Sequence, residues 1–285
     1  MARAIERIER DIAALKEAIG AIALQLQTAY ASYLASLGVT LQKQLILATY
    51  HLCTQGYPEN FLNLSLNQRQ QLQQAIRKLS QVAAEQLVAY ISEEVGEDEE
   101  DEEVGGDEQD EEAGGDEEVG VDEEENTSLS LSFPDTSNPI ELAKWQQNIE
   151  DITQEILKKV SHEANVLLQK AGILPKKLPE PILAAAAAAA SEASAEVMPG
   201  PPNLLNLIIE IDNEQQSEDS GLTQIMAINL RLGEIEFADP TLSSERRQIR
   251  GILVQLNKLE REYQKKLREK TVAEAEAAWR ASWFE

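Results

Sequence analysis

Apolar residues recur at alternating intervals of three and four at the start of the chain. This heptad pattern runs over about four repeats and predicts an amphipathic helix with a narrow apolar stripe. Such a stripe packs on another helix, either in the same chain, which we favour, or in a second copy, which would give a homo-oligomer. Ile12, Ile19 and Ile22 are therefore candidate partner-binding residues. The full stripe consists of Ile5, Ile8, Ile12, Leu15, Ile19, Ile22, Leu26 and Ala29.

Two further helices are predicted before the middle of the chain. The apolar pattern resumes after Gly38 and stops at Gly56-Tyr57-Pro58, because Gly followed by Pro is a strong helix stop. Ser65 and Gln68 have the spacing of a capping box, so a third helix is expected to begin there. Three helices of this size can close a small core. Residues 1–92 are therefore predicted to form an all-α bundle or coiled coil.

An acidic tract separates this bundle from the rest of the chain. Between Glu93 and Glu125, 21 of 33 residues are Asp or Glu and none is Lys or Arg. These carboxylates account for most of the formal net charge of −26, and the remainder of the chain carries −5. Like charges at this density repel one another, and the tract has few apolar residues to bury. Residues 93–137 are therefore predicted to be a disordered linker.

The C-terminal part, residues 138–285, combines two periodicities. Asn138-Pro139 is a typical helix start, and apolar positions three and four apart follow it. Residues 205–211 and 222–232 alternate between apolar and polar across a Gly-containing loop, which predicts a β-hairpin. Beyond Gly233 the alternation shifts by one residue, and we interpret the shift as a bulge or a sharp twist. This part is therefore predicted to be an α+β module.

A long helix is predicted from about Ser243 to Ala281. Between Ser243 and Lys270 it carries nine Lys or Arg against four Glu, which makes it a basic helix in an acidic chain. Its last residues include Trp279 and Trp283, four apart on one helical face, followed by Phe284. We favour docking of these three aromatic residues on the chain's own core, with anchoring of a partner as the alternative. The candidate basic face consists of Arg246, Arg250, Lys265 and Arg268.

Residues that carry catalytic or metal chemistry are sparse. Cys53 is the only cysteine, so no intramolecular disulfide forms, which is compatible with a reducing compartment. His51 lies two residues from Cys53, a spacing that puts the two side chains on different faces of a helix. The CxxC, HExxH, GxGxxG and P-loop motifs are all absent from the sequence. The sequence therefore predicts no catalytic residue, no metal site and no cofactor.

These patterns together favour a mostly α, cytoplasmic, non-enzymatic scaffold or adaptor. It would bind protein partners through its helical and hairpin surfaces. No stretch approaches the ~20 apolar residues that a membrane span needs. Glu residues interleaved with the basic side chains are typical of a solvated helix face and argue against nucleic acid as a partner. The alternative is an acidic, chaperone-like or nucleic-acid-mimicking regulator that binds basic partners through residues 93–125.

Overall fold

The computed structural model describes residues 2–92, 138–175, 201–211 and 221–283. Within these residues the chain is mostly helical and has one small antiparallel hairpin, as the sequence predicts. The predicted acidic linker, the alanine run at 184–190 and Phe284 lie outside the described residues. In chain order the elements are α1 (Ala2–His51), η1 (Leu52–Gly56), α2 (Pro58–Leu62), α3 (Leu66–Ser92), α4 (Pro139–Lys170), β1 (Leu204–Ile211), β2 (Gly221–Ile228), α6 (Leu232–Ala238) and α7 (Pro240–Ala281).

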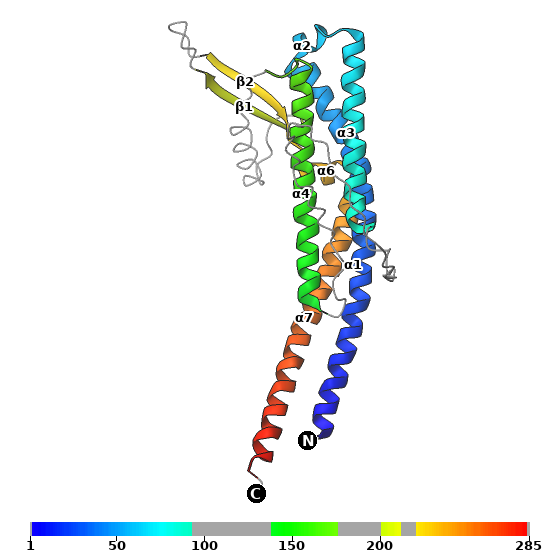
Figure 1. The fold of residues 1–285 in the computed structure, drawn as a ribbon, viewed down its shortest axis with the longest axis vertical. Coiled ribbons are helices and arrows are strands. Elements are labelled where there is room, and N and C mark those ends of the chain that lie inside the picture. The colour runs from blue at the N-terminus through cyan, green and yellow to red at the C-terminus, as the bar shows by residue number, and fades with distance from the viewer. Residues whose placement is uncertain (1, 93–137, 176–200, 212–220, 284–285) are drawn as a thin grey trace, which may run out of the picture.

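The two longest helices, α1 and α7, run antiparallel along the axis of an elongated molecule (Figure 1). Arg246, near the start of α7, reaches Tyr33 in the middle of α1, whereas Lys270, towards the end of α7, pairs with Glu9 at 2.9 Å. The first turns of α1 and the last turns of α7 therefore lie together at one end of the molecule. We call this end, residues 5–20 and 258–283, the stalk.

The first helix is continuous over 50 residues, so the predicted division at Gly38 is wrong. Gly38 serves close packing instead, since a Cβ atom at this position would lie 2.9 Å from the Cβ of Ala84 on α3. The absent side chain lets α1 and α3 approach each other, and the neighbouring Leu37 is fully buried at this crossing. The helix then passes into the π-helical turn η1, which ends at Gly56 as the sequence predicts.

Side-chain caps begin three of the described helices. Ser65 and Gln68 form the predicted capping box ahead of α3, with hydrogen bonds of 2.9 and 3.3 Å between each side chain and the other's backbone N–H. Asn138 caps α4 and Asp239 caps α7, each accepting a hydrogen bond from the backbone N–H two residues on. Because Asp239 provides the cap, α7 begins at Pro240, three residues before its predicted start.

The predicted hairpin is present, but the predicted bulge after it is not. β1 and β2 pair antiparallel, with Leu204 opposite Ile228 at the inner end of the ladder. The residues around Gly233 form the short helix α6 instead of continuing a strand. The shift in the apolar pattern therefore marks a change from a two-residue to a helical period. Ile235 is fully buried on the inner side of α6, whereas Phe237 is 90% exposed.

One hydrophobic core joins the segments on either side of the acidic tract. α1 packs against both α3 and α7, and α3 packs against α4. Tyr30 of α1 contacts Trp145 of α4 edge to face, with ring centroids 5.7 Å apart. The ranges 1–92 and 138–285, which the sequence predicts to be separate domains, therefore contribute to the same hydrophobic core. The buried face of α1 is wider than α3 alone can cover, and α6 and α7 from the second segment pack against the rest of it.

Candidate functional site

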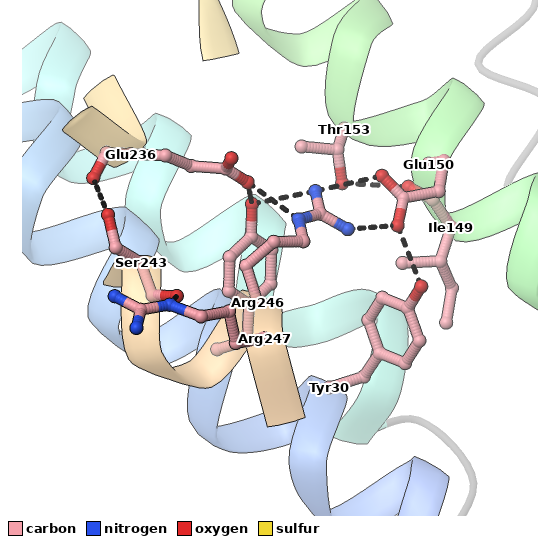
Figure 2. A network of polar contacts seen from close by, with 9 residues as sticks. Tyr30, Ile149, Glu150, Thr153, Glu236, Ser243, Arg246 and Arg247 are labelled. Carbon is pink, nitrogen blue, oxygen red and sulfur yellow. Dashed lines mark hydrogen bonds and ion pairs between the residues drawn. The ribbon is translucent and has the colours of Figure 1, made fainter. Parts of the chain in front are cut away.

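A buried polar cluster centres on Arg246 of α7 (Figure 2). Its guanidinium group donates hydrogen bonds to Glu236 of α6 at 2.6 Å and to both carboxylate oxygens of Glu150 of α4. It also donates to the hydroxyl of Tyr33 on α1 at 2.9 Å and lies over that ring, 4.5 Å from its centroid. One side chain of α7 thus connects its own helix to α1, α4 and the adjacent α6.

The two tyrosines of α1 complete this cluster. The hydroxyl of Tyr30 donates to Glu150 at 2.7 Å, and that of Tyr33 donates to Glu236 at 2.6 Å. The side chains of Arg246, Glu150 and Glu236 are only 11%, 18% and 16% exposed. Each carboxylate accepts hydrogen bonds from the guanidinium group and from a tyrosine hydroxyl, and these hydrogen bonds offset the cost of its burial. We call the five residues the Arg246 network.

Tyr30, Tyr33 and Glu150 of the network are held in their resting protonation states. Burial, reinforced by the hydrogen bond to Glu150, raises the pKa of Tyr30 far above its usual range, and burial likewise raises the pKa of Tyr33. Burial alone would raise the pKa of Glu150, but hydrogen bonds from Arg246 and Tyr30 outweigh it and hold that pKa below its ordinary value. A catalytic acid or base needs a pKa near the working pH. The network therefore has the chemistry of a structural clamp.

Arg246, a member of the predicted basic face, has a side chain that is only 11% exposed and points into the molecule. It precedes Ile249 by three residues and Leu253 by seven, so it lies on the inward side of α7. This spacing is present in the sequence and distinguishes Arg246 from the other predicted basic residues. Its partners were missed because Glu150 and Glu236 lie at sequence distances of 96 and 10 residues, with no local pattern that connects them.

The predicted partner-binding isoleucines lie inside the molecule. Ile12, Ile19 and Ile22 are all buried in the chain on its own. This is the same-chain packing that the sequence analysis favours over association between copies. A role for these three residues in binding a partner stays a prediction.

Trp279 and Trp283 do not dock on the core, in contrast to the interpretation favoured from the sequence. Their side chains are 65% and 72% exposed, and the two rings contact each other with centroids 5.5 Å apart. They lie on the outward face of α7, opposite the face that packs on α1. The apolar surface of the core is therefore out of their reach.

One edge of the predicted hairpin surface is already covered. The Tyr57 hydroxyl exchanges hydrogen bonds with the backbone N–H and C=O of Met226, at 3.0 and 3.2 Å. The Asn165 amide does the same with Ile228, at 2.9 Å for both bonds. These side chains satisfy the backbone groups of β2 that would otherwise recruit another strand. At these positions β2 is closed to strand addition.

Cys53 and His51 do not form a reactive pair. Cys53 is buried, and burial raises the pKa of its thiol to about 11, so the thiol stays protonated at neutral pH. The His51 ring contacts the neighbouring Tyr50, with centroids 5.4 Å apart. In the part of the chain that the structure describes, no three His, Cys, Asp or Glu side chains are grouped to hold a metal ion.

A shallow hollow of about 530 Å³ lies between α1 and α3, away from the network. Ile46 lines it together with polar side chains of α3. Val39, Ile46 and Tyr50 share one side of α1 and are 53%, 43% and 57% exposed. We call these three residues the α1 outer face. The other residues that line the hollow are Gln42, Arg77, Ser80, Gln81, Ala84 and Glu85.

No protein-family model, curated protein or solved structure matches this sequence. Among the residues that the structure describes, no helix is long and apolar enough to cross a membrane. Three features of the molecule stand out as candidates for a function: the Arg246 network, the α1 outer face and the exposed end of α7.

Proposed function

We propose that this protein is a non-enzymatic scaffold or adaptor that holds a protein partner on the α1 outer face. The observation that carries the proposal is the exposed row of Val39, Ile46 and Tyr50 beside the hollow between α1 and α3. Apolar side chains at helical spacing usually face a core. Here the opposite side of α1 already fills the core, so this row is available to another molecule.

The rigidity of the surrounding helices supports this proposal. α1 is held against α7 by the Arg246 network and against α3 by the close contact at Gly38. A surface that is fixed before binding loses little conformational entropy when a partner arrives. The same rigidity suits a scaffold, which has to keep its surfaces in a constant arrangement.

A helical partner fits this surface best. The apolar residues are spaced seven and four apart on α1, and the hollow beside Ile46 runs between two helices. This arrangement favours an amphipathic partner helix that lays its apolar side into the groove. Arg77 and Glu85 of α3 line the same hollow, and their opposite charges would set the direction of the partner helix.

The proposal is tested by cross-linking in the source cells, followed by binding with purified components. A photoreactive benzoylphenylalanine replaces Tyr50, because it is aromatic and the site is exposed. The protein joined to it is identified by mass spectrometry, purified and titrated by calorimetry. We expect Ile46→Asp to weaken its binding at least tenfold, because a carboxylate would then face the apolar side of the partner.

The matched control is Gln70→Asp, the same new charge at an exposed position of α3. It should leave the affinity within twofold of that of the unchanged chain. Equal affinities for the Ile46→Asp variant and the unchanged chain would refute the proposal, as would the absence of any adduct at position 50. An adduct with a second copy of this chain would assign the α1 outer face to self-association instead.

A further inference from the structure

The outward side of α7 carries a continuous row of exposed side chains. The row repeats at intervals of three and four residues from Arg247 to Trp283, and every member is exposed. It holds six Lys or Arg, two Val and two Trp, with a single Glu. We call it the α7 outer stripe. Its members are Arg247, Arg250, Val254, Lys258, Arg261, Lys265, Arg268, Val272, Glu276, Trp279 and Trp283.

The stripe faces away from the other residues that the structure describes. At about 3.6 residues per turn, its positions fall about half a turn from Leu256, Leu259 and Tyr263, which pack on the core. Among the described residues of the stalk, α1 is the helix that lies beside α7, on one side of it (Figure 1). The stripe therefore forms a convex ridge along the outside of the stalk.

The basic residues of the stripe differ from those at the contact with α1. Lys266 and Lys270 are neutralised across that contact by Asp11 at 3.1 Å and Glu9 at 2.9 Å. The stripe cations, by contrast, form no ion pair with any other described residue, so their charge is available to an external anion. The cations without such a pair are Arg247, Arg250, Lys258, Arg261, Lys265 and Arg268.

The distal end of the stripe is aromatic. Val272, Trp279 and Trp283 follow the last stripe cation, and the two indole rings contact each other at an interplanar angle of 44° while staying exposed. Tryptophan concentrates where water meets hydrocarbon, because its ring is apolar and its N–H is polar. A cation row that leads into exposed Val and Trp on the same helix face combines two features of helices that lie on membranes.

We propose that the α7 outer stripe binds the surface of an anionic lipid bilayer, with the stalk lying along the membrane plane. The stripe residues of the stalk, 258–283, extend over about 38 Å at ~1.5 Å per residue, long enough for several lipid headgroups. Lys and Arg contact the headgroup phosphates and carboxylates, while the two indoles enter the boundary with the acyl chains. Screening at physiological salt limits repulsion by the chain's other carboxylates to those within about 8 Å.

The shape of the stripe favours a lipid surface over other anionic partners. A protein partner is usually anchored by aromatic or arginine side chains in a pocket, whereas this row stands on a convex ridge. Nucleic acid would engage the cations, but bases stack on aromatic side chains spread along a phosphate-binding groove. The two indoles of the stripe instead lie together at its distal end, beyond the last stripe cation. A bilayer surface requires neither a pocket nor a matching periodicity.

The test is flotation of the full chain with extruded vesicles at 0.15 M salt. Vesicles of phosphatidylcholine with 30% phosphatidylserine are compared with vesicles of phosphatidylcholine alone. We expect binding to the anionic vesicles, with quenching of tryptophan fluorescence by brominated acyl chains. Arg261→Glu/Lys265→Glu/Arg268→Glu should weaken binding about 100-fold or more, because each cation near an anionic surface contributes about fivefold. Trp279→Ala/Trp283→Ala should abolish the quenching.

The matched control reverses three exposed charges on α4, as Lys144→Glu/Lys158→Glu/Lys159→Glu. It changes the net charge by the same amount as the stripe variant, and its affinity for anionic vesicles should stay within threefold of that of the unchanged chain. Equal binding by the stripe variant and this control would overturn the proposal, provided that both melt at the temperature of the unchanged chain. Absence of binding by the unchanged chain would overturn it as well.

A duplex DNA probe separates a lipid site from a general polyanion site. The lipid proposal would be overturned if the chain bound DNA as tightly as anionic vesicles and if Trp279→Ala/Trp283→Ala left the affinity for DNA unchanged. The stripe would then be a general polyanion site. This inference does not depend on the proposed protein partner, because it concerns a different helix. Ile46→Asp leaves the stripe intact and should float with anionic vesicles like the unchanged chain.

Discussion

Replacing Arg246 by Met tests whether the Arg246 network holds the four helices together. Methionine keeps much of the aliphatic volume but removes the four hydrogen bonds that the guanidinium group donates and its contact with the Tyr33 ring. Glu150 and Glu236 would then remain buried as carboxylates, on different helices, without a cation between them. Their burial would no longer be compensated by an opposite charge.

The expected loss follows from the burial of these partners. Breaking a buried ion pair by removing one member costs about 3–5 kcal/mol. The lower end of this range applies, because Tyr30 and Tyr33 still donate to the two carboxylates and water reaches part of each side chain. We therefore expect the free energy of unfolding to fall by about 3 kcal/mol. In a chain of this size that lowers Tm by about 6–12 °C.

The measurement is urea unfolding at pH 7, followed by circular dichroism at 222 nm. The matched control is Arg247→Met, one residue along α7, where the exposed guanidinium group donates, among the described residues, to the backbone C=O of Ser243 alone. It should change the unfolding free energy by less than about 0.5 kcal/mol. A loss for Arg246→Met no larger than that for Arg247→Met would show that the network contributes nothing to the fold.

Acid should reduce the difference between the unchanged chain and Arg246→Met. The pKa of Glu150 is lower in the folded chain than in the unfolded one, so its contribution is fully present above the ordinary carboxyl pKa of about 4.3. It is lost as the pH falls through the lower, folded value. Urea unfolding of both chains at pH 7, 5 and 3 should give curves that converge at the acid end. A difference that stays constant over this range would contradict the role assigned to the carboxylate.

Three substitutions and one labelling experiment probe packing, capping and the thiol. Gly38→Val should lower the free energy of unfolding by about 1–3 kcal/mol, because the new side chain would clash with α3. Gly251→Ala, at an exposed position of α7 with open space around it, should raise the free energy of unfolding by about 0.5–1 kcal/mol. Urea unfolding measures both. Ser65→Ala removes the acceptor for the backbone N–H of Gln68 and should cost about 1 kcal/mol in the same assay. Cys53 should react with Ellman's reagent at pH 8 only after urea is added, since its thiol is buried and has a pKa of about 11; rapid reaction of the folded chain would contradict its burial.

Local patterns predicted the elements whose causes are local. The capping box at Ser65, the cap at Asn138 and the hairpin alternation each depend on residues within a few positions, and the structure shows all three. Gly38 led to a wrong prediction because an isolated glycine resembles a helix break. The glycine is needed instead for the close contact of α1 with Ala84 on α3, at a sequence distance of 46 residues. Around Gly233 a short helix and a bulge produce the same shift in the apolar pattern.

The candidate site was predicted less well, because its causes are long-range. The charge of Arg246 suggests an exposed side chain. Its guanidinium group can be buried because Glu150 and Glu236 lie beside it in space and offset the free-energy cost of its desolvation. The end of α7 misled in the opposite direction. Two tryptophans predict docking on a core, but the periodicity that places them on the outer side of α7 is the same one that carries the stripe cations. Following that face along the whole helix would have shown their exposure.

The pairing of the first long helix with the last has a consequence for synthesis in the cell. About 190 residues separate the end of α1 from the start of α7. At ~5–20 residues per second, α1 leaves the ribosome about 10–40 s before α7 does. During that interval the isoleucine side of α1 has no α7 to cover it, so the nascent chain is a substrate for chaperones that bind apolar segments. Folding of the long axis is therefore completed only when the final helix emerges.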